Sequence, residues 1–260
     1  MNNYKEISRT LAVSVCIGLT ILLACAALMF ILGIREDIHS PPKAPADNTG
    51  ISDPTLESTY DYGDIYLHQM IIFCDSVFSN IEKHGILNDS SIIITGQDGD
   101  MPLDFNSSSA QINRPSSQGG AQSITDIAAE QTPQYLIICI GLKNGVEHCS
   151  EEKFKQYYQK LIDSVNAASP DTKIIVASIL PTSQNVSKNQ PAISADKIER
   201  ANKWIYQLAL SNSLRYLDLS EALKNDKGYI KNEYDSGDGI HPNKQGYLAL
   251  IEYIKTHGYK

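Results

Sequence analysis

The sequence predicts an α/β fold with a parallel sheet covered by helices on both faces. Two observations support this prediction: short apolar segments of strand length recur along the chain, and longer segments with helical spacing lie between them. Strands that alternate with helices in this way are typical of parallel sheets. The predicted strands are 69–73, 91–95, 135–140, 173–179 and 214–217, and the predicted helices lie around 123–130, 151–168, 194–212 and 244–256.

The first predicted strand, 69–73, is followed at once by a polar turn and a helical pattern. The turn consists of Cys74, Asp75 and Ser76. A short apolar run, a polar turn and then a helix together indicate the start of a βα unit. Ligands of open parallel sheets bind outside the carboxyl ends of the strands. Ser76 is therefore a candidate for chemistry, and the alternative is that it only caps the helix.

The segment 96–119 fits neither the strand nor the helix pattern. It opens with the turn signal Gly96–Asp100 and is rich in serine. Such a length is unusual for a connection inside a compact domain. We therefore expect a functional loop or a small hairpin that shapes access of the substrate.

The two long helical segments after it carry apolar stripes. The segment 151–168 carries Phe154, Tyr157, Tyr158 and Leu161, which are expected to be mostly in the core. In 194–212 the stripe that should be buried consists of Ile198, Ala201, Ile205, Leu208 and Ala209.

Composition excludes some classes of function. The net charge of −8 and the isoelectric point near 5.2 argue against binding of nucleic acid, which requires clustered Lys and Arg. The cysteines show no CxxC pair and no metal pattern, and their spacing does not establish a disulfide. We expect neither a metal nor a cofactor. The five cysteines are Cys16, Cys25, Cys74, Cys139 and Cys149.

The N-terminal region predicts a membrane anchor. Residues 11–34 carry no charge and exceed the roughly 20 residues that a helix needs to cross a bilayer. A cleavable signal peptide has a shorter apolar core. Leu22–Cys25 faintly resembles a lipoprotein processing site, but the apolar run continues past it. The sequence thus predicts a cytoplasmic tail at 1–10 and a transmembrane helix at 11–34.

The rest of the chain is expected outside the cell. Basic residues flank the apolar segment on both sides, so charge alone does not set its orientation in the membrane. A short basic tail before the first span usually stays in the cytosol, and a long domain after it translocates largely regardless of charge. Residues 35–61 contain four prolines among small polar residues and are predicted to form a flexible linker. The globular domain is predicted at 62–260.

A second polar motif lies near the C-terminus, in Asp238–Gly239–Ile240–His241–Pro242. Asp238 and His241 are three positions apart with a glycine between them, so a turn can bring the carboxylate to the imidazole. This contact fixes the tautomer of the ring and stabilises the imidazolium. A serine needs such a base because its hydroxyl is a poor nucleophile at neutral pH. A simple turn with a surface histidine is the alternative.

Four blocks together resemble the SGNH/GDSL hydrolases, most closely their membrane-anchored members in Gram-positive bacteria. In chain order they are Asp75–Ser76, Gly120, Asn144 within Gly141–Gly145, and Asp238–Pro242. The resemblance covers about residues 62–260. It implies a flavodoxin-like three-layer α/β/α sandwich.

The resemblance also implies roles for individual residues. Ser76 would be the nucleophile, His241 the general base and then acid, and Asp238 the group that orients His241. The oxyanion hole would consist of the backbone N–H groups of Ser76 and Gly120 and the side-chain amide of Asn144. Three donors aimed at one point stabilise the negative oxygen of a tetrahedral acyl intermediate. Asp75 is expected to hydrogen-bond locally, without a part in the chemistry.

The sequence departs from the family pattern at two positions. Cys74 stands where the family usually has glycine, and this would matter if the position required a positive φ. The third block usually reads Gly-x-Asn, but here Lys143 occupies the third place and Asn144 the fourth. Either Asn144 points inward after a one-residue insertion, which we favour, or Lys143 faces the site.

The expected function is that of a membrane-anchored extracellular serine esterase. Its substrates would be small acyl esters, such as O-acetyl groups on cell-envelope glycans. Two alternatives stay open: an acyltransferase with the same triad, and a degenerate domain that binds an envelope polysaccharide or protein without turnover.

Overall fold

The computed structural model describes residues 52–87, 93–96, 100–112 and 120–259. Its centre is a five-stranded sheet in the order β2-β1-β3-β4-β5, and every neighbouring pair of strands is parallel. This order is that of flavodoxin-like sheets. The predicted parallel sheet is confirmed. The strands are β1 (Met70–Cys74), β2 (Ile93–Ile94), β3 (Tyr135–Cys139), β4 (Lys173–Ala177) and β5 (Arg215–Leu217).

The two central strands explain why the sequence shows continuous apolar runs. Every residue of β1 and β3 is buried. A parallel sheet covered on both faces requires such runs, because side chains on both sides of each strand meet helices. The register pairs Met70 with Tyr135 and Cys74 with Cys139, so the two strands end at the same level.

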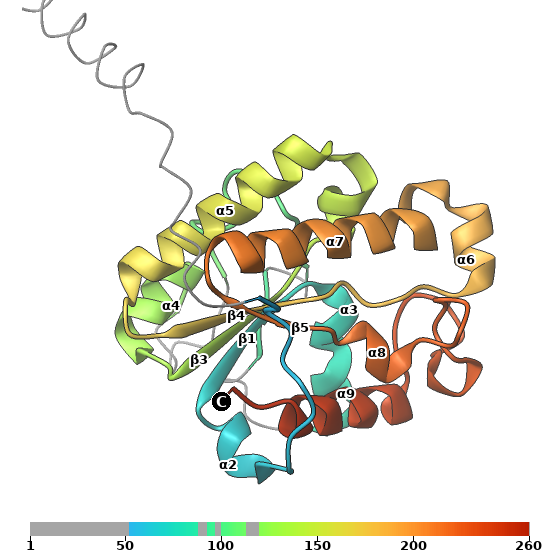
Figure 1. Cartoon of the computed structure of the whole chain (residues 1–260), viewed down its shortest axis with the longest axis horizontal. Coiled ribbons are helices and arrows are strands. Elements are labelled where there is room, and N and C mark those ends of the chain that lie inside the picture. Colours follow the sequence, from blue (N-terminus) through green and yellow to red (C-terminus); the bar gives the residue numbers. More distant parts are fainter. Residues whose placement is uncertain (1–51, 88–92, 97–99, 113–119, 260) are drawn as a thin grey trace, which may run out of the picture. The chain divides into compact units, whose positions relative to one another are not determined.

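The helices form a layer on each face of the sheet (Figure 1). One layer contains α4 (Ile124–Gln131), α5 (Glu151–Ala168) and α7 (Ala195–Ser211). The other contains α2 (Gly63–Leu67), α8 (Ser220–Leu223) and α9 (Lys244–Thr256), together with α3 (Ser76–Ser79) and the 3₁₀ helix Asn80–His84 that continues it. The short α6 (Gln184–Asn189) follows β4.

The long helices begin and bury their side chains as the sequence predicts. Side-chain oxygens of Ser123, Ser150 and Asn243 accept hydrogen bonds at the N-termini of α4, α5 and α9. The stripe expected on α7 is the buried set of that helix. Trp204 is partly buried and contacts Phe154, with ring centroids 5.4 Å apart.

The domain begins earlier than the sequence predicts. Within the predicted linker 35–61, Thr55 forms a parallel bridge with Tyr216 of β5, and the side chain of Leu56 is buried. The two backbone bonds of this bridge join Leu56 N–H to the Tyr216 carbonyl and Tyr216 N–H to the Pro54 carbonyl. This segment covers the free edge of β5, and an uncovered edge strand promotes aggregation.

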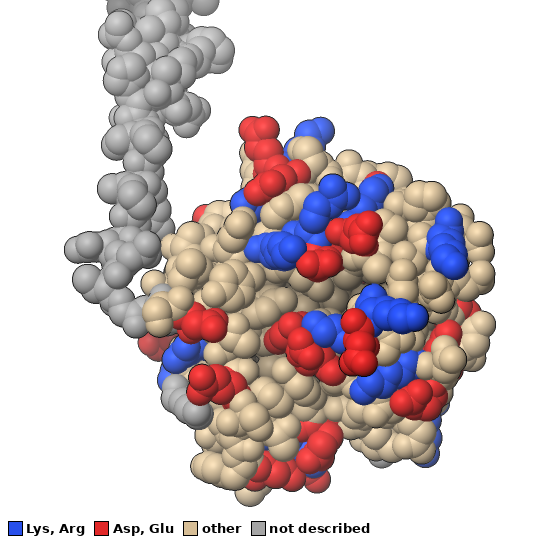
Figure 2. Space-filling view, turned by 45° about the vertical axis from the view of Figure 1, so that its right-hand side comes forward, with Lys and Arg blue, Asp and Glu red and all other residues tan. Residues whose placement is uncertain are grey.

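The predicted membrane helix at 11–34 lies outside the described residues. Across the ranges that the structure does describe, no helix is both long enough and apolar enough to cross a bilayer. On the face shown in Figure 2, basic side chains lie beside acidic ones and form no continuous basic patch.

The core of the sheet yields a test of the fold. Ile137, in the middle of β3, is fully buried, whereas Ile65 on α2 is 76% exposed. We expect Ile137→Ala to lower the free energy of unfolding by about 2–5 kcal/mol, because the lost methyl groups leave a cavity. The matched Ile65→Ala should change it by less than about 0.5 kcal/mol. Urea unfolding of both variants measures the two values, and equal values would contradict the burial of Ile137 in the core.

Candidate catalytic site

Ser76 occupies the first position of α3, directly after β1. Asp75 caps this helix in an extended conformation (φ −88°, ψ −175°), and its Oδ1 accepts the Val77 N–H at 3.2 Å. The Ser76 side chain is half-buried. The local sequence therefore presents a serine at the carboxyl edge of the sheet, where the sequence analysis places it.

Asp75 also reaches a distant segment, which the sequence analysis did not anticipate. Its Oδ2 accepts the backbone N–H of Leu142 at 3.4 Å. Burial raises the pKa of Asp75 to about 6, although the N–H groups of Val77, Leu142 and Gly141 and the charge of His241 act in the opposite direction.

Asp238 and His241 meet as their spacing predicts. His241 Nδ1 lies 2.7 Å from Asp238 Oδ2, while Asp238 Oδ1 accepts the backbone N–H groups of Ile240 and His241 at 2.8 Å each. Burial alone would raise the pKa of Asp238, but the hydrogen bonds from His241 and Ile240 outweigh it and lower the pKa to about 2. At neutral pH the carboxylate is therefore ionised and holds Nδ1 as a donor.

The loop that carries this pair is fixed at both ends. Oδ1 of Asp235 accepts the N–H groups of Gly237 and Gly239, and Asp235 pairs with Pro242 in an antiparallel bridge. Gly239 has φ 77°, and a Cβ there would lie 2.2 Å from the Ser183 hydroxyl. Only glycine fits this position without displacing its neighbours.

Helix α9 connects this loop to the helix of Ser76. The Tyr247 hydroxyl donates to the Val77 carbonyl at 2.8 Å, and the Tyr247 ring lies 5.3 Å from the His84 ring. Among the described residues, no hydrogen bond joins the Ser76 hydroxyl to the imidazole of His241. Such contacts are often long in a free enzyme and shorten when substrate binds.

Cys74 does not disturb the turn before Ser76. It is the last residue of β1, and it is absent from the residues with positive φ among those described, so the position does not require glycine. Burial raises the pKa of its thiol well above the ordinary range, which keeps the thiolate unpopulated at neutral pH. Cys74, Cys139 and Cys149 are free thiols.

The third block forms an irregular turn over Leu142–Val146, which we call the Leu142 turn. Lys143 is extended there and Asn144 has φ 63°, so the backbone reverses between two consecutive residues. Asn144 tolerates the left-handed region better than most residues. Gly141, just before the turn, has φ 132°.

The reversal separates the side chains of Lys143 and Asn144. Lys143 is exposed and forms an ion pair with Asp100. Asn144 is half-buried, and its Nδ2 donates to the Leu103 carbonyl at 3.1 Å. An amide nitrogen carries two hydrogens, so one remains for another acceptor. Of the two candidates, Asn144 is thus the less exposed and has a donor to spare.

Gly120 precedes α4, between residues outside the described ranges and the cap Ser123. It has φ 74°, and a Cβ there would meet no atom of the described residues within 4 Å. No contact in the described part of the chain joins Gly120 to Ser76 or Asn144. Its place in an oxyanion hole stays a prediction.

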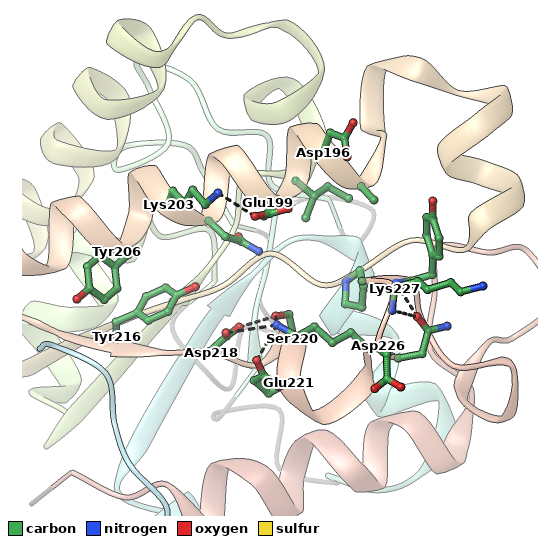
Figure 3. A pocket seen from close by; sticks show the side chains of 18 residues that line it. Asp196, Glu199, Lys203, Tyr206, Tyr216, Asp218, Ser220, Glu221, Asp226 and Lys227 are labelled. Atoms are coloured by element: carbon green, nitrogen blue, oxygen red, sulfur yellow. Dashed lines mark hydrogen bonds and ion pairs between the residues drawn. The ribbon is translucent and has the colours of Figure 1, made fainter.

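A cavity of about 690 Å³ lies elsewhere, between α7, α8 and the loop 225–229 (Figure 3). None of the candidate catalytic residues lines it. Several of its charged groups pair with one another, as in Lys203 with Glu199 and Lys224 with Glu221. In the described ranges, no cluster of His, Cys, Asp and Glu could hold a metal ion.

The lowered pKa of Asp238 predicts a dependence of stability on pH. A carboxylate whose pKa falls from 3.8 to about 2 on folding stabilises the fold above about pH 4, and this contribution disappears as the pH falls through 2. Wild type should therefore melt above Asp238→Asn at pH 6, and the gap should close between pH 4 and 2. Thermal unfolding over this range measures the gap; a constant gap would contradict the assignment.

Comparison with known proteins gives one family and one fold. The model of the GDSL-like lipase/acylhydrolase family matches residues 103–249, a range that includes Gly120, Asn144, Asp238 and His241 and begins after Ser76. The comparison with curated proteins found no match.

Among solved structures, a Streptococcus pneumoniae protein described as a platelet activating factor is 19% identical, with a TM-score of 0.51 over 74% of this chain and 88% of that chain. A GDSL-like lipase from Bacteroides thetaiotaomicron is 16% identical, with a TM-score of 0.48 over 71% and 84%. An acylhydrolase of Bacteroides fragilis is also 16% identical, with a TM-score of 0.47 over 76% and 86%. The first of these shows a shared fold. Because the family model spans more than half of the 260 residues, this chain belongs to the GDSL-like lipase/acylhydrolase family.

Proposed function

We propose that this chain is a serine ester hydrolase in which Ser76, His241 and Asp238 form a catalytic triad. One observation carries the proposal: the 2.7 Å contact between Asp238 and His241 lies on a loop that α9 connects to the helix of Ser76. An ionised carboxylate on Nδ1 leaves Nε2 free to accept a proton, which is the role of a general base.

The first half of the reaction transfers the acyl group to Ser76. Nε2 of His241 takes the hydroxyl proton while Oγ attacks the ester carbonyl carbon. The tetrahedral oxyanion accepts hydrogen bonds from the N–H groups of Ser76 and Gly120 and from the Asn144 amide. When the intermediate collapses, the C–O bond to the alcohol breaks, and His241 returns the proton to the leaving oxygen.

The second half regenerates the enzyme. His241 takes a proton from water, which attacks the acyl-enzyme carbonyl and forms a second oxyanion in the same site. Collapse releases the carboxylic acid, and the proton returns to Ser76. This sequence of steps requires neither a metal nor a redox cofactor. An acyltransferase would differ only in using an alcohol in place of water.

The two departures from the family pattern favour catalysis over a degenerate binding domain. Cys74 lies in a strand conformation that any residue adopts, so the turn before Ser76 is intact. Lys143 is held by Asp100 at the surface, whereas Asn144 is half-buried. The insertion is thus absorbed by the backbone reversal at Asn144, and an amide donor is kept.

We further propose that the domain acts outside the cell on small acyl esters, such as O-acetyl groups of cell-envelope glycans, and that residues 11–34 anchor it. The support is the uncharged length of this segment and the basic residues Lys5 and Arg9 before it. An anchored domain at the outer face would meet envelope polymers first.

Substitution of the nucleophile tests the catalytic proposal. With the full chain purified in mild detergent, Ser76→Ala should reduce hydrolysis of 4-nitrophenyl acetate by at least about 10⁴-fold, because no other group can form the acyl-enzyme. A fluorophosphonate should add one adduct to wild type and none to this variant, as measured by intact mass. Ser211→Ala, whose hydroxyl bonds to the Leu208 carbonyl and to the neighbouring Asn212 amide at the end of α7, is the control. Full hydrolysis by folded Ser76→Ala would refute the mechanism.

Carbonate extraction of cell membranes tests the anchor. Wild type should stay in the membrane pellet. The double variant Leu22→Asp/Leu23→Asp should move to the supernatant, because each aspartate at the centre of a span costs about 2.5–3.5 kcal/mol. Asn48→Asp/Thr49→Asp adds the same charge outside the predicted span and should not change the distribution. Extraction of wild type into the supernatant would exclude the anchor.

A further inference from the structure

Asp75 connects two segments that carry different parts of the proposed site. Its Oδ1 accepts from Val77 at the start of α3, and its Oδ2 accepts from Leu142, 67 residues further along the chain. The carboxylate is only 5% exposed. Each oxygen therefore accepts a hydrogen bond from one segment, and water does not compete for these bonds because the side chain is buried.

The second segment is the Leu142 turn, and contacts with other parts of the chain hold it in position. The Leu142 turn has no regular helical backbone, since Lys143 is extended and Asn144 has a positive φ. On one side Leu103 and Asp100 hold it, through the Leu103 N–H to the Lys143 carbonyl and through the Asp100 ion pair. On the side of Ser76, the Asp75 carboxylate holds it at the first residue of the turn.

A helix cap alone does not require this side chain to be a carboxylate. Serine and asparagine cap helices as well as aspartate does. Burying a charge is costly, and the raised pKa of Asp75 reflects that cost. What a carboxylate adds is a second acceptor oxygen, because asparagine has only one oxygen and would turn an NH₂ group toward the Leu142 N–H.

We propose that Asp75 is a positioning residue that joins the start of α3 to the Leu142 turn and so holds Asn144 in place relative to Ser76. The proposal rests on the proposed esterase function. Asp75 does not touch the reacting atoms; it acts through the distance between the nucleophile and one oxyanion donor.

The test compares Asp75→Asn with Asp61→Asn in the full chain. Oδ1 of Asp61 likewise accepts a local backbone N–H, that of Gly63 at the start of α2, and its Oδ2 lies 3.8 Å from the Lys255 ammonium. Within the described part of the chain, no distant backbone N–H donates to Asp61 as Leu142 does to Asp75. In Asp75→Asn we expect kcat for 4-nitrophenyl acetate to fall about 10- to 100-fold with KM within about threefold, since a displaced oxyanion donor affects the transition state. Asp61→Asn should keep both constants.

Hydrogen exchange gives a readout that does not need activity. Amides of residues 140–147 should exchange about tenfold faster in Asp75→Asn than in wild type, while α5 should keep its rate. Asp75→Ser, which caps a helix but has one oxygen, provides a second variant should the first not fold. Labelling of Ser76 by the fluorophosphonate should persist in both, because Ser76 and His241 are unchanged.

The outcomes separate this proposal from the proposed function. Unchanged exchange of residues 140–147, or a kcat within twofold of wild type in folded Asp75→Asn, overturns the role of Asp75. If wild type itself neither hydrolyses esters nor reacts with the probe, the esterase function fails, and the exchange rates still decide whether Asp75 holds the Leu142 turn.

Discussion

The parallel register of β1 and β3 is the constraint on which the rest of the site depends. Cys74 and Cys139 are paired, so both strands end at one level, and the Asp75 N–H bonds to the Cys139 carbonyl at 3.3 Å. The turns that follow the two strands must therefore start side by side. This is why Ser76 and the Leu142 turn, far apart in sequence, can be joined by a single buried carboxylate.

Two carboxylates near the site show opposite electrostatic behaviour for clear reasons. Asp75 is almost fully enclosed, and its few N–H donors do not offset the loss of hydration, so its pKa rises. Asp238 stays partly exposed and accepts two backbone N–H groups and the imidazole, so its pKa falls. The exposed carboxylate is thus suited to stabilise an imidazolium, whereas the buried one is suited to hold backbone segments together.

The structure also shows how the variant third block separates the side chains of Lys143 and Asn144. One additional residue would rotate every later side chain in a regular helix by about 100°. Here the backbone reverses at Asn144 instead, and Lys143 turns outward to Asp100. The segment from Asp100 to Leu103, which the sequence analysis assigned to an access loop, supplies contacts that fix this turn.

The sequence by itself determined the parallel sheet, the long helices with their buried stripes and the approach of His241 to Asp238. These follow from local rules, because strand runs, helical periodicity and a three-residue turn need no knowledge of distant contacts. It missed the short helices α2, α6 and α8, which lack a repeated apolar face, and the pairing of Thr55 with β5.

Only the tertiary structure decided the direction of Lys143 and Asn144 and the second bond of Asp75. Both depend on partners about 40 and 67 residues away, whose position is set by the register of the sheet. A local pattern carries no information about such partners, since the strands that bring them together pair through backbone groups that all residues share.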